Sequence, residues 1–417
     1  MQATLPPPVV TDLNSPEMQR RINALRVTDN LTNWFYLFRE WAIVAVVIGL
    51  TIAFYQNYAE WGLHWAWNIP VTFLAVVLIG ACQHRLTNLT HEASHYMLFR
   101  NRLLNELVSD WCCMYPMLSM THHYRLQHLA HHQYVNDPEK DPDVFQMTES
   151  GHRYDFPMPP GQFIWECVVK QLVVFTKLIR YIRVRAKYNA TGMGKGPYRI
   201  EGKKSRWLVL AGVLYLFSLI ATLTGLVMHG NPVLLAVIPT VMWAGMMAFY
   251  GLIPADLYMK SMLKPDVPPR VMTLMRITFL SGLFMTLAWL THLTGQWWGM
   301  YYLVLWIVPM VTTFSFFMIM RQVVQHGNAG QDRLTNTRIF QVNRLIQLAV
   351  FPLGMDWHLP HHMFPLVPHY RLKELHELLM ETESYRQNAV VVEGYFLHRT
   401  QPPQHPTVVD LMSQPPR

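Results

Sequence analysis

Six long apolar runs divide the chain, and they lie at residues 41–58, 65–83, 207–228, 232–253, 272–292 and 300–320. Each run is close to the ~20 residues with which a helix crosses the hydrocarbon core of a bilayer. Two long polar segments, residues 84–206 and 321–417, separate or follow the runs. The pattern predicts an all-α protein: a polytopic membrane domain of helices with a helical cap outside the bilayer.

The distribution of Lys and Arg predicts how these helices are oriented. The short connections at residues 59–64, 229–231 and 293–299 contain no basic residue. Basic residues collect on the cytoplasmic side of membrane proteins. We therefore expect these three connections outside, and both termini and both polar segments in the cytoplasm. Arg276, near the start of the fifth run, is the one basic residue that fits this arrangement poorly.

The polar ends of the chain predict three regions. Residues 1–40 are expected to form a mobile N-terminal tail with an interfacial lead-in. Residues 41–385 form the membrane domain, and residues 386–417, rich in proline toward their end, form a C-terminal tail. The N-terminal residues lack the charged-then-apolar order of a cleaved signal peptide, so we expect the tail to be retained.

Two segments between the second and third runs resemble spans only in part. Residues 103–120 are apolar but contain Asn105, Glu106 and Asp110, which favours a re-entrant or surface-lying helix over a seventh span. Residues 163–188 mix apolar and basic side chains, a pattern typical of one helix in the headgroup plane. The glycines of residues 189–206 then predict a loop into the third span.

Composition supports a membrane protein. Hydrophobic residues make up 51% of the chain and charged residues only 14%, a balance that soluble domains rarely show. The net charge of +8 would suggest a nucleic-acid partner in a soluble protein, but here the basic residues report topology, so none is predicted. The four cysteines form no C-x-x-C pair and are expected to be buried, reduced thiols.

Three histidine clusters carry the candidate chemistry. They are HEASH at residues 91–95, HLAHH at 128–132 and HLPHH at 358–362, with histidines at 91, 95, 128, 131, 132, 358, 361 and 362. Spacings of three and four residues put imidazoles on one face of a helix, and repetition of this spacing predicts a metal site. Eight imidazoles exceed the needs of one ion and suit two. Imidazole binds iron, zinc, copper or nickel, so the ligands alone do not name the metal.

The three clusters, in this order between apolar runs, resemble the histidine boxes of the membrane fatty acid desaturase superfamily, which includes hydroxylases and ketolases. The similarity spans roughly residues 40–380. It implies a cytoplasmic cap with a histidine-rich dinuclear site of two non-haem irons, bound by His91, His95, His128, His131, His132, His358, His361, His362 and, just after the last span, His326. It also implies an O2-dependent fatty acyl (lipid) desaturase, with the acyl chain carried on CoA, a carrier protein or a glycerolipid. The histidines suit a lipid hydroxylase equally well.

Several neighbouring residues are expected to support the ligands. By the same resemblance Gln322 would contact a metal through water, with Gln325 as an alternative, although both could simply cap the helix. Glu92, Asp141 and Asp143 could accept the second N–H of a ligating imidazole, and so could Asp137, unless the three aspartates form only a solvated turn. His84 shares a helix face with His91 and is expected to have a supporting or structural role. His122, His123, His369 and His376 lack box spacing and are predicted not to be ligands.

The electrons for such a reaction must come from a partner. The chain has neither a cysteine set for an iron–sulfur cluster nor a His-Pro-Gly-Gly haem signature. A basic cytoplasmic face would attract a ferredoxin or a small b-type cytochrome with its reductase, although the same charges could serve topology and anionic lipid alone.

Three other functions remain open at this point. HEASH matches the H-E-x-x-H motif of zinc metalloproteases, but a membrane protease would leave most of the histidines without a role. A carotenoid or other terpenoid oxygenase could use the same boxes on a different apolar substrate. A catalytically inactive scaffold is disfavoured because every box histidine is present.

Overall fold

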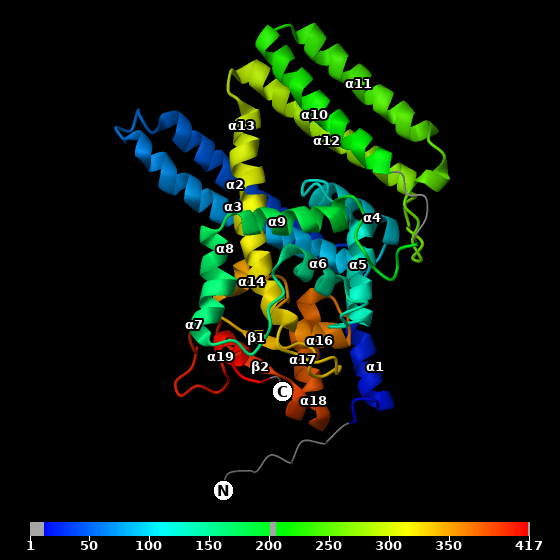
Figure 1. Ribbon diagram of the computed structural model, residues 1–417, viewed down its shortest axis with the longest axis vertical. Helices are drawn as coiled ribbons and strands as arrows, with labels where there is room; N and C mark the ends of the chain where they lie inside the picture. The colour runs from blue at the N-terminus through cyan, green and yellow to red at the C-terminus, as the bar shows by residue number, and fades with distance from the viewer. Residues whose placement is uncertain (1–11, 201–205, 416–417) are drawn as a thin grey trace.

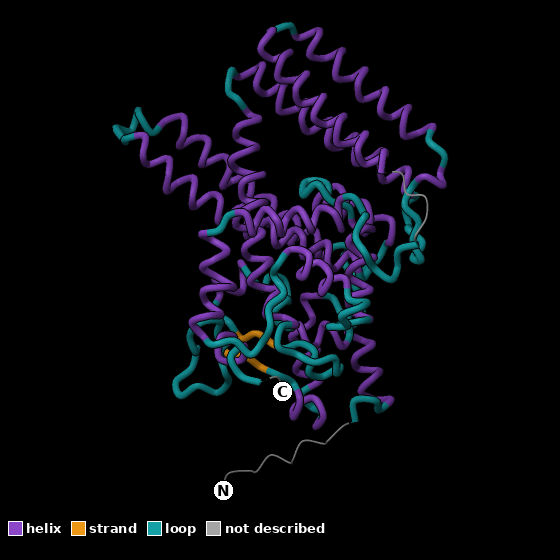
Figure 2. The backbone as a smooth tube through the Cα atoms, viewed as in Figure 1, coloured by secondary structure: helices purple, strands orange, loops and turns teal. Residues whose placement is uncertain are grey.

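The computed structural model describes residues 12–200 and 206–415, and within them the protein is almost entirely helical (Figure 2). Six helical stretches are long and apolar enough to cross a membrane. They are α2 (Thr32–Asn57), α3 (Asn68–Ser94), α10 (Arg206–His229), α11 (Pro232–Leu252), α12 (Pro269–Thr294), and the stretch from α13 (Trp298–Tyr302) to α14 (Ser315–His326). The predicted fold class is confirmed, and the chain fits a multi-pass membrane protein.

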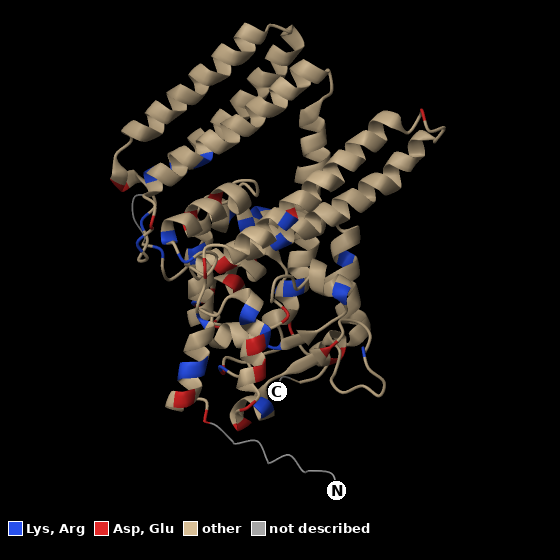
Figure 3. Ribbon diagram, turned by 180° about the vertical axis from the view of Figure 1, so that it is seen from behind, with Lys and Arg blue, Asp and Glu red and all other residues tan. Residues whose placement is uncertain are grey.

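The long helices project from a helical cap in two groups. The hairpin of α2 and α3 leaves the cap on one side, and α10, α11 and α12 form a three-helix unit at the top of the view (Figure 1). The stretch from α13 to α14 runs from this unit down into the centre of the cap. Charged residues are concentrated in the cap and are almost absent along the projecting helices (Figure 3), which agrees with insertion of these helices into a bilayer.

Close packing of α3 on α14 fixes the entry of both helices into the cap. Gly80 of α3 lies against the π-helical turn (Met310–Phe314) that leads into α14, where an added Cβ would overlap the Thr313 hydroxyl and lie 2.8 Å from the Phe314 backbone nitrogen. The Thr313 hydroxyl donates to the Val76 carbonyl across the same contact, at 2.7 Å. Small residues allow such close approach between membrane helices.

Replacement of Gly80 by alanine should therefore destabilise the protein by about 1–3 kcal/mol, the usual cost of overpacking. The measurement is thermal unfolding of the purified protein in detergent. Gly49→Ala in α2 is the matched control, because nothing lies within 4 Å of a Cβ added there. Equal unfolding temperatures for the two variants would show that the α3–α14 contact can relax.

The described parts of both chain ends contain short elements that pack on the rest of the protein. Helix α1 (Pro16–Leu25) begins at a Ser15 cap and buries Met18 and Ile22 against α17 (Leu372–Leu379). Strand β2 (Val391–Glu393) pairs in parallel with β1 (Ile339–Gln341), and α19 (Val408–Met412) packs into the main core. These elements are too short for their periodicity to show in the sequence. Residues 1–11 and 416–417 of the expected tails lie outside the described residues.

The two partly apolar segments of the cap also take definite forms. Residues 103–120 contain the short helix α4 (Arg102–Ser109) and a π-helical turn (Asp110–Met114), and they are not among the six long helices. Residues 163–188 do not form the single helix that was predicted. Helical turns from α7 (Pro160–Phe163) to α8 (Lys170–Val173) end at Val174, and α9 (Thr176–Arg185) begins in a new direction.

Contacts with α6 (Pro142–Ser150) explain this break. Arg180 donates to the Glu149 carbonyl at 3.0 Å and Lys187 pairs with the Glu149 carboxylate at 2.7 Å, so part of the basic face contacts α6. The location of α9 in the headgroup plane stays a prediction.

The loop predicted at residues 189–206 begins after a π-helical turn that ends at Ala190. Its residues 201–205 lie outside the described part of the chain.

Arg276, the basic residue that fitted the topology poorly, is accommodated by backbone carbonyls. Its guanidinium donates to the carbonyls of Ala190 and Leu118, each at 2.7 Å. Both acceptors belong to the cap, so the charge at the start of α12 faces the protein. The contact ties the three-helix unit to the cap segments beside α5 (Thr121–Gln133).

Candidate metal centre

Four elements bring the predicted histidines together. His91 lies in the last turn of α3 and His95 ends that helix, while His128, His131 and His132 lie on one face of α5. His326 is the last residue of α14, and α16 (His358–Met363) carries His358, His361 and His362. The helical spacing within each cluster, combined with the meeting of the four elements, gathers all nine imidazoles.

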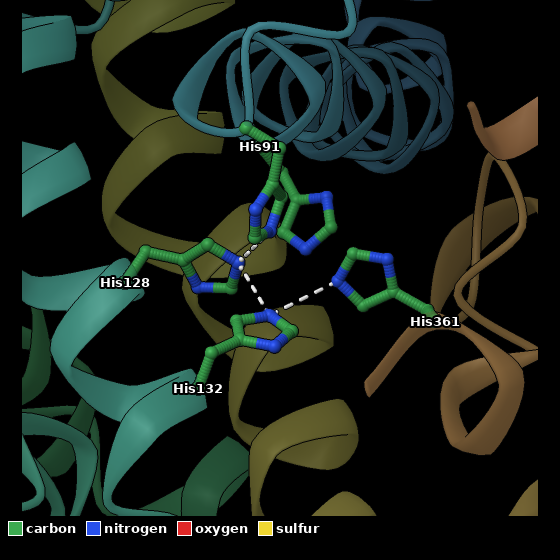
Figure 4. A group of neighbouring side chains, drawn as sticks. His91, His128, His132 and His361 are labelled. Carbon is green, nitrogen blue, oxygen red and sulfur yellow. Dashed lines mark hydrogen bonds between the residues drawn. The ribbon is translucent and has the colours of Figure 1, made fainter. Parts of the chain in front are cut away.

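The first group contains five of these imidazoles, and Figure 4 shows the rings of four of them, His91, His128, His132 and His361, turned toward one another. The group consists of His91, His95, His128, His132 and His361, each of which offers a ring nitrogen within 4.8 Å of the others. The His128 Nε2 lies 2.9 Å from the His95 Nε2 and 3.0 Å from the His132 Nε2. The His132 Nε2 lies 3.1 Å from the His361 Nε2.

The second group adjoins the first. Ring nitrogens of His131, His326 and His362 lie within 4.8 Å of one another. The His358 Nε2 completes the group, at 3.0 Å from the His326 Nε2 and 3.1 Å from the His362 Nε2. The His132 and His362 rings are stacked with their centroids 4.1 Å apart, so the two groups share a boundary.

The donor set fits two transition-metal ions. A neutral imidazole carries one N–H, so Nε2 atoms that face each other at about 3 Å cannot all be satisfied by protons. Burial lowers the pKa of His128, His132 and His361 well below its usual value, and repulsion from the other imidazoles adds to this. The Nε2 of His91 is buried beside the first group without a hydrogen-bond partner. Neutral nitrogen donors of this kind suit transition metals rather than Mg2+ or Ca2+.

Asp141 fixes the orientation of His131, as the sequence predicted for this carboxylate. The His131 Nδ1 donates to Asp141 at 2.9 Å, which turns the Nε2 toward the second group. Burial alone would lower the pKa of His131, but the carboxylates of Asp141 and Asp143 outweigh it and raise the pKa to about 9. Asp141 is also the N-cap of α6 and accepts from the Asp143 amide.

Asp141→Asn should lower metal affinity or activity by roughly 10- to 100-fold, the typical effect of losing the partner of a ligating histidine. Asparagine caps helices as well as aspartate does, so α6 should persist. Metal content after dialysis against a graded chelator is the measurement. Asp137→Asn is the control, because Asp137 accepts only from amides of its own turn, at 2.8 and 3.1 Å. Equal metal retention by the two variants would contradict the role of Asp141.

The other expected supporting residues divide into those at the site and those away from it. Glu92 lies 3.3 Å from the His91 Nδ1 and also accepts from the His369 amide at 2.8 Å. Gln322 accepts from the Tyr181 hydroxyl and lies 3.5 Å from Asp143, whose carboxylate acts on His131 without a direct hydrogen bond to it. Gln325 has a buried side-chain nitrogen without a hydrogen-bond partner.

The remaining histidines of the prediction lie outside both groups. His84 bonds the Ala349 carbonyl at 2.7 Å, which assigns it a structural contact. His122 contacts Ser261 at 3.1 Å, His369 contacts Asn33 at 2.9 Å, and His376 contacts Tyr385 at 3.0 Å. His123 contacts the Asn189 carbonyl at 3.2 Å.

A buried ion pair behind the first group was not predicted. Arg125 of α5 forms two hydrogen bonds with Glu106 of α4, one of them at 2.8 Å, and donates to the carbonyls of Ala93 and Ser94 at 2.7 and 3.1 Å. These carbonyls end α3 between His91 and His95. The sequence feature that could have indicated this ion pair is Glu106, a carboxylate within an apolar segment. A carboxylate that is buried requires a partner.

A small chamber at the histidines adjoins two larger cavities. A chamber of about 30 Å3 is lined by His91, His128, His131, His326 and His358 together with polar side chains. An apolar cavity of about 130 Å3 shares with this chamber the residues Tyr124, Arg185, Asn189 and Arg321. A more polar cavity of about 220 Å3 shares with it His131, Asp143, Gln322 and His326. The chamber therefore lies between an apolar and a polar space.

Long apolar helices and two adjoining histidine groups define a membrane protein with a candidate dinuclear metal site. The sequence profile of the fatty acid desaturase family matches residues 68–258 and 252–394. The chain belongs to this family and is an oxidoreductase. Membership in this family excludes the interpretation as a metalloprotease. In addition, the Glu92 carboxylate accepts from the His369 amide and is therefore not placed as the base of a protease.

Three relatives are desaturases by name. The chain is 23% identical to a dihydrorhizobitoxine desaturase of Bradyrhizobium elkanii over 96% of its own length and 89% of the relative. It is 27% identical to a sphingolipid delta(4)-desaturase of Drosophila melanogaster over 34% of its length and 41% of the relative. A delta 8-(E)-sphingolipid desaturase of Candida albicans is 24% identical over 36% of this chain and 28% of the relative.

Proposed function

We propose that this protein is an O2-dependent desaturase that removes two hydrogens from neighbouring carbons of a fatty acyl or related lipid chain. The observation that carries the proposal is the gathering of nine imidazoles from four elements beside an apolar cavity. The five-histidine group would hold one iron, and the group of His131, His326, His358 and His362 the other. Relatives named for desaturation favour this outcome over hydroxylation.

Side-chain acids and bases cannot break an unactivated C–H bond, so two bound irons would supply the redox chemistry with O2. The reaction balances when two hydrogens of the substrate, two electrons from a donor and two protons reduce one O2 to two molecules of water. The protein's own residues hold the ligands, exclude water and align the chain. Arg125 and Asp141 fix the imidazoles, and burial of the first group keeps bulk water away.

The electron donor in this proposal is a ferredoxin or a small b-type cytochrome with its reductase. The four cysteines are free in the structure, and none is placed to hold a cluster. We also propose that the cap and both termini face the cytoplasm. The short connections at residues 59–64, 229–231 and 293–299 contain no Lys or Arg, which supports this orientation.

Expression in a host of defined fatty acid content tests the function. New double bonds in extracted lipids or free acids, located by mass spectrometry, and two irons per purified chain are the expected results. Hydroxylated chains would favour the hydroxylase alternative, and altered pigments would favour a terpenoid oxygenase. One zinc per chain with unchanged lipids and acids would contradict the proposal.

A further inference from the structure

Two arginines lie where the histidine chamber meets the apolar cavity. Arg321 belongs to the last turns of α14, and Arg185 ends α9; both line the chamber and the cavity. Arg321 donates to the Asn88 side chain at 2.5 Å and approaches the Met318 sulfur at 3.4 Å. Arg185 donates to the Gln146 side chain at 2.9 Å. Both guanidiniums therefore have only neutral partners.

Two other buried arginines, Arg85 and Arg125, have carboxylate partners that Arg185 and Arg321 lack in the described part of the chain. Arg85 pairs with Glu40 and Arg125 with Glu106, but within residues 12–200 and 206–415 no carboxylate forms an ion pair with Arg185 or Arg321. The Arg321 Nε is buried with no hydrogen-bond partner at all. The Asp143 carboxylate also lines the chamber and attracts both guanidiniums, but within the described residues it forms no ion pair with either. A buried charge without a direct counter-ion is costly, so an anion bound between the two arginines would be stabilised.

The shape of the adjoining cavity limits what that anion can carry. The cavity is lined mainly by apolar side chains, among them Met117, Leu118, Ile182, Met310 and Phe314. A cavity of roughly 150 Å3 accepts a benzene molecule, so about 130 Å3 holds about six carbon atoms. The planar guanidinium fork matches a carboxylate in a bidentate arrangement. Together these features fit a carboxylate with a short apolar tail.

We propose that the substrate binds as an unesterified acid, with its carboxylate held by Arg185 and Arg321 and its tail in the apolar cavity. This inference rests on the proposed desaturase function and names the form of the acyl chain that the site takes. The described lining of the apolar cavity contains no histidine, whereas five histidines line the chamber. The carbons that reach the histidines are therefore the ones nearest the carboxylate, and the double bond forms there.

Ligand binding to the purified full-length protein in detergent tests this inference without turnover. The probes share a chain of six carbons and differ in the head group: hexanoate, methyl hexanoate, hexyl phosphate and hexylamine. We expect hexanoate to raise the unfolding temperature saturably and to bind at least about 10-fold more tightly than its methyl ester, since a charge-assisted hydrogen bond has about this effect. Equal binding of acid and ester would overturn the proposal. Tighter binding of the phosphate would point to a phospholipid head group and overturn it as well.

Variants locate the binding site. Arg321→Gln and Arg185→Gln should each weaken hexanoate binding by about 10- to 100-fold and leave binding of the ester unchanged. Arg183→Gln is the matched control, because Arg183 is exposed on the same helix α9. Unchanged hexanoate affinity in both chamber variants would overturn the assignment. The comparison of acid with ester in the unaltered protein remains decisive if a variant fails to fold.

The two proposals fail in different ways. If hexanoate binds through the arginines but no double bond appears in any lipid or acid of the host, the desaturase function is wrong and the carboxylate site stands. If lipids gain double bonds while acid and ester bind equally, the function stands and the carboxylate site is wrong. Binding of the acid together with a double bond close to its carboxyl end is the result expected from both.

Discussion

His132→Ala will yield a folded protein that keeps fewer than two metal ions per chain and loses more than about 100-fold of its activity. The imidazole of His132 faces both His128 and His361 through its Nε2, at 3.0 and 3.1 Å. Its ring also stacks on His362 of the second group. Loss of a residue that hydrogen-bonds a ligating histidine typically reduces metal affinity or activity by about 10- to 100-fold. Loss of the ligating histidine itself should therefore have a larger effect. Iron content by elemental analysis and product formation on the same sample are the measurements.

His84→Ala is the matched control for this variant. His84 is fully buried and lies on the same helix as His91, but it bonds the Ala349 carbonyl rather than the metal site. We expect this variant to be less stable and to retain both ions. Two irons in His132→Ala would remove His132 from the ligand set, and loss of iron in His84→Ala would give His84 a role that its contacts do not indicate.

Arg125→Ala will destabilise the protein by about 3–5 kcal/mol, because it leaves the Glu106 carboxylate buried without its cation. Arg125 is 0% exposed and Glu106 is 2% exposed, so water cannot replace the lost contact. The carbonyls of Ala93 and Ser94 lose their donor at the same time, which loosens the end of α3 between His91 and His95. Thermal unfolding in detergent measures the effect.

Two comparisons isolate the cause. Arg21→Ala breaks the exposed ion pair with Glu381 and should change stability by less than about 1 kcal/mol. The double variant Arg125→Met with Glu106→Leu removes both charges and should be more stable than Arg125→Ala. A double variant as unstable as the single one would show that the carbonyl contacts of Arg125, rather than its charge, hold the site.

The histidine centre was largely predictable because its geometry is local within each cluster. Spacings of three and four residues place His128, His131 and His132 on one helix face whatever the tertiary fold. Hydropathy then placed the clusters on one side of the membrane. His326 was different: it stands alone at the end of α14, and only resemblance to the family indicated it.

Features that depend on tertiary contact were not predictable. Nothing local in residues 163–188 marks Val174 as a break, since the break follows from contacts of α9 with Glu149. The elements at both chain ends are too short to show a period, and α19 is helical because its buried face fills the core. The ion pair of Arg125 with Glu106 links residues 19 positions apart whose pairing no sequence spacing specifies.

The order of the clusters along the chain has a consequence for biosynthesis. His361 follows His132 by 229 residues, and four of the six long helices lie between them. At about 5–20 residues per second, a ribosome needs roughly 10–50 s to make that interval. During this time α3 and α5 already exist without α16, so the first group lacks His361 and the second lacks His358 and His362. Nascent chains stalled before α16 should therefore be the species most open to capture of the wrong metal or to proteolytic quality control.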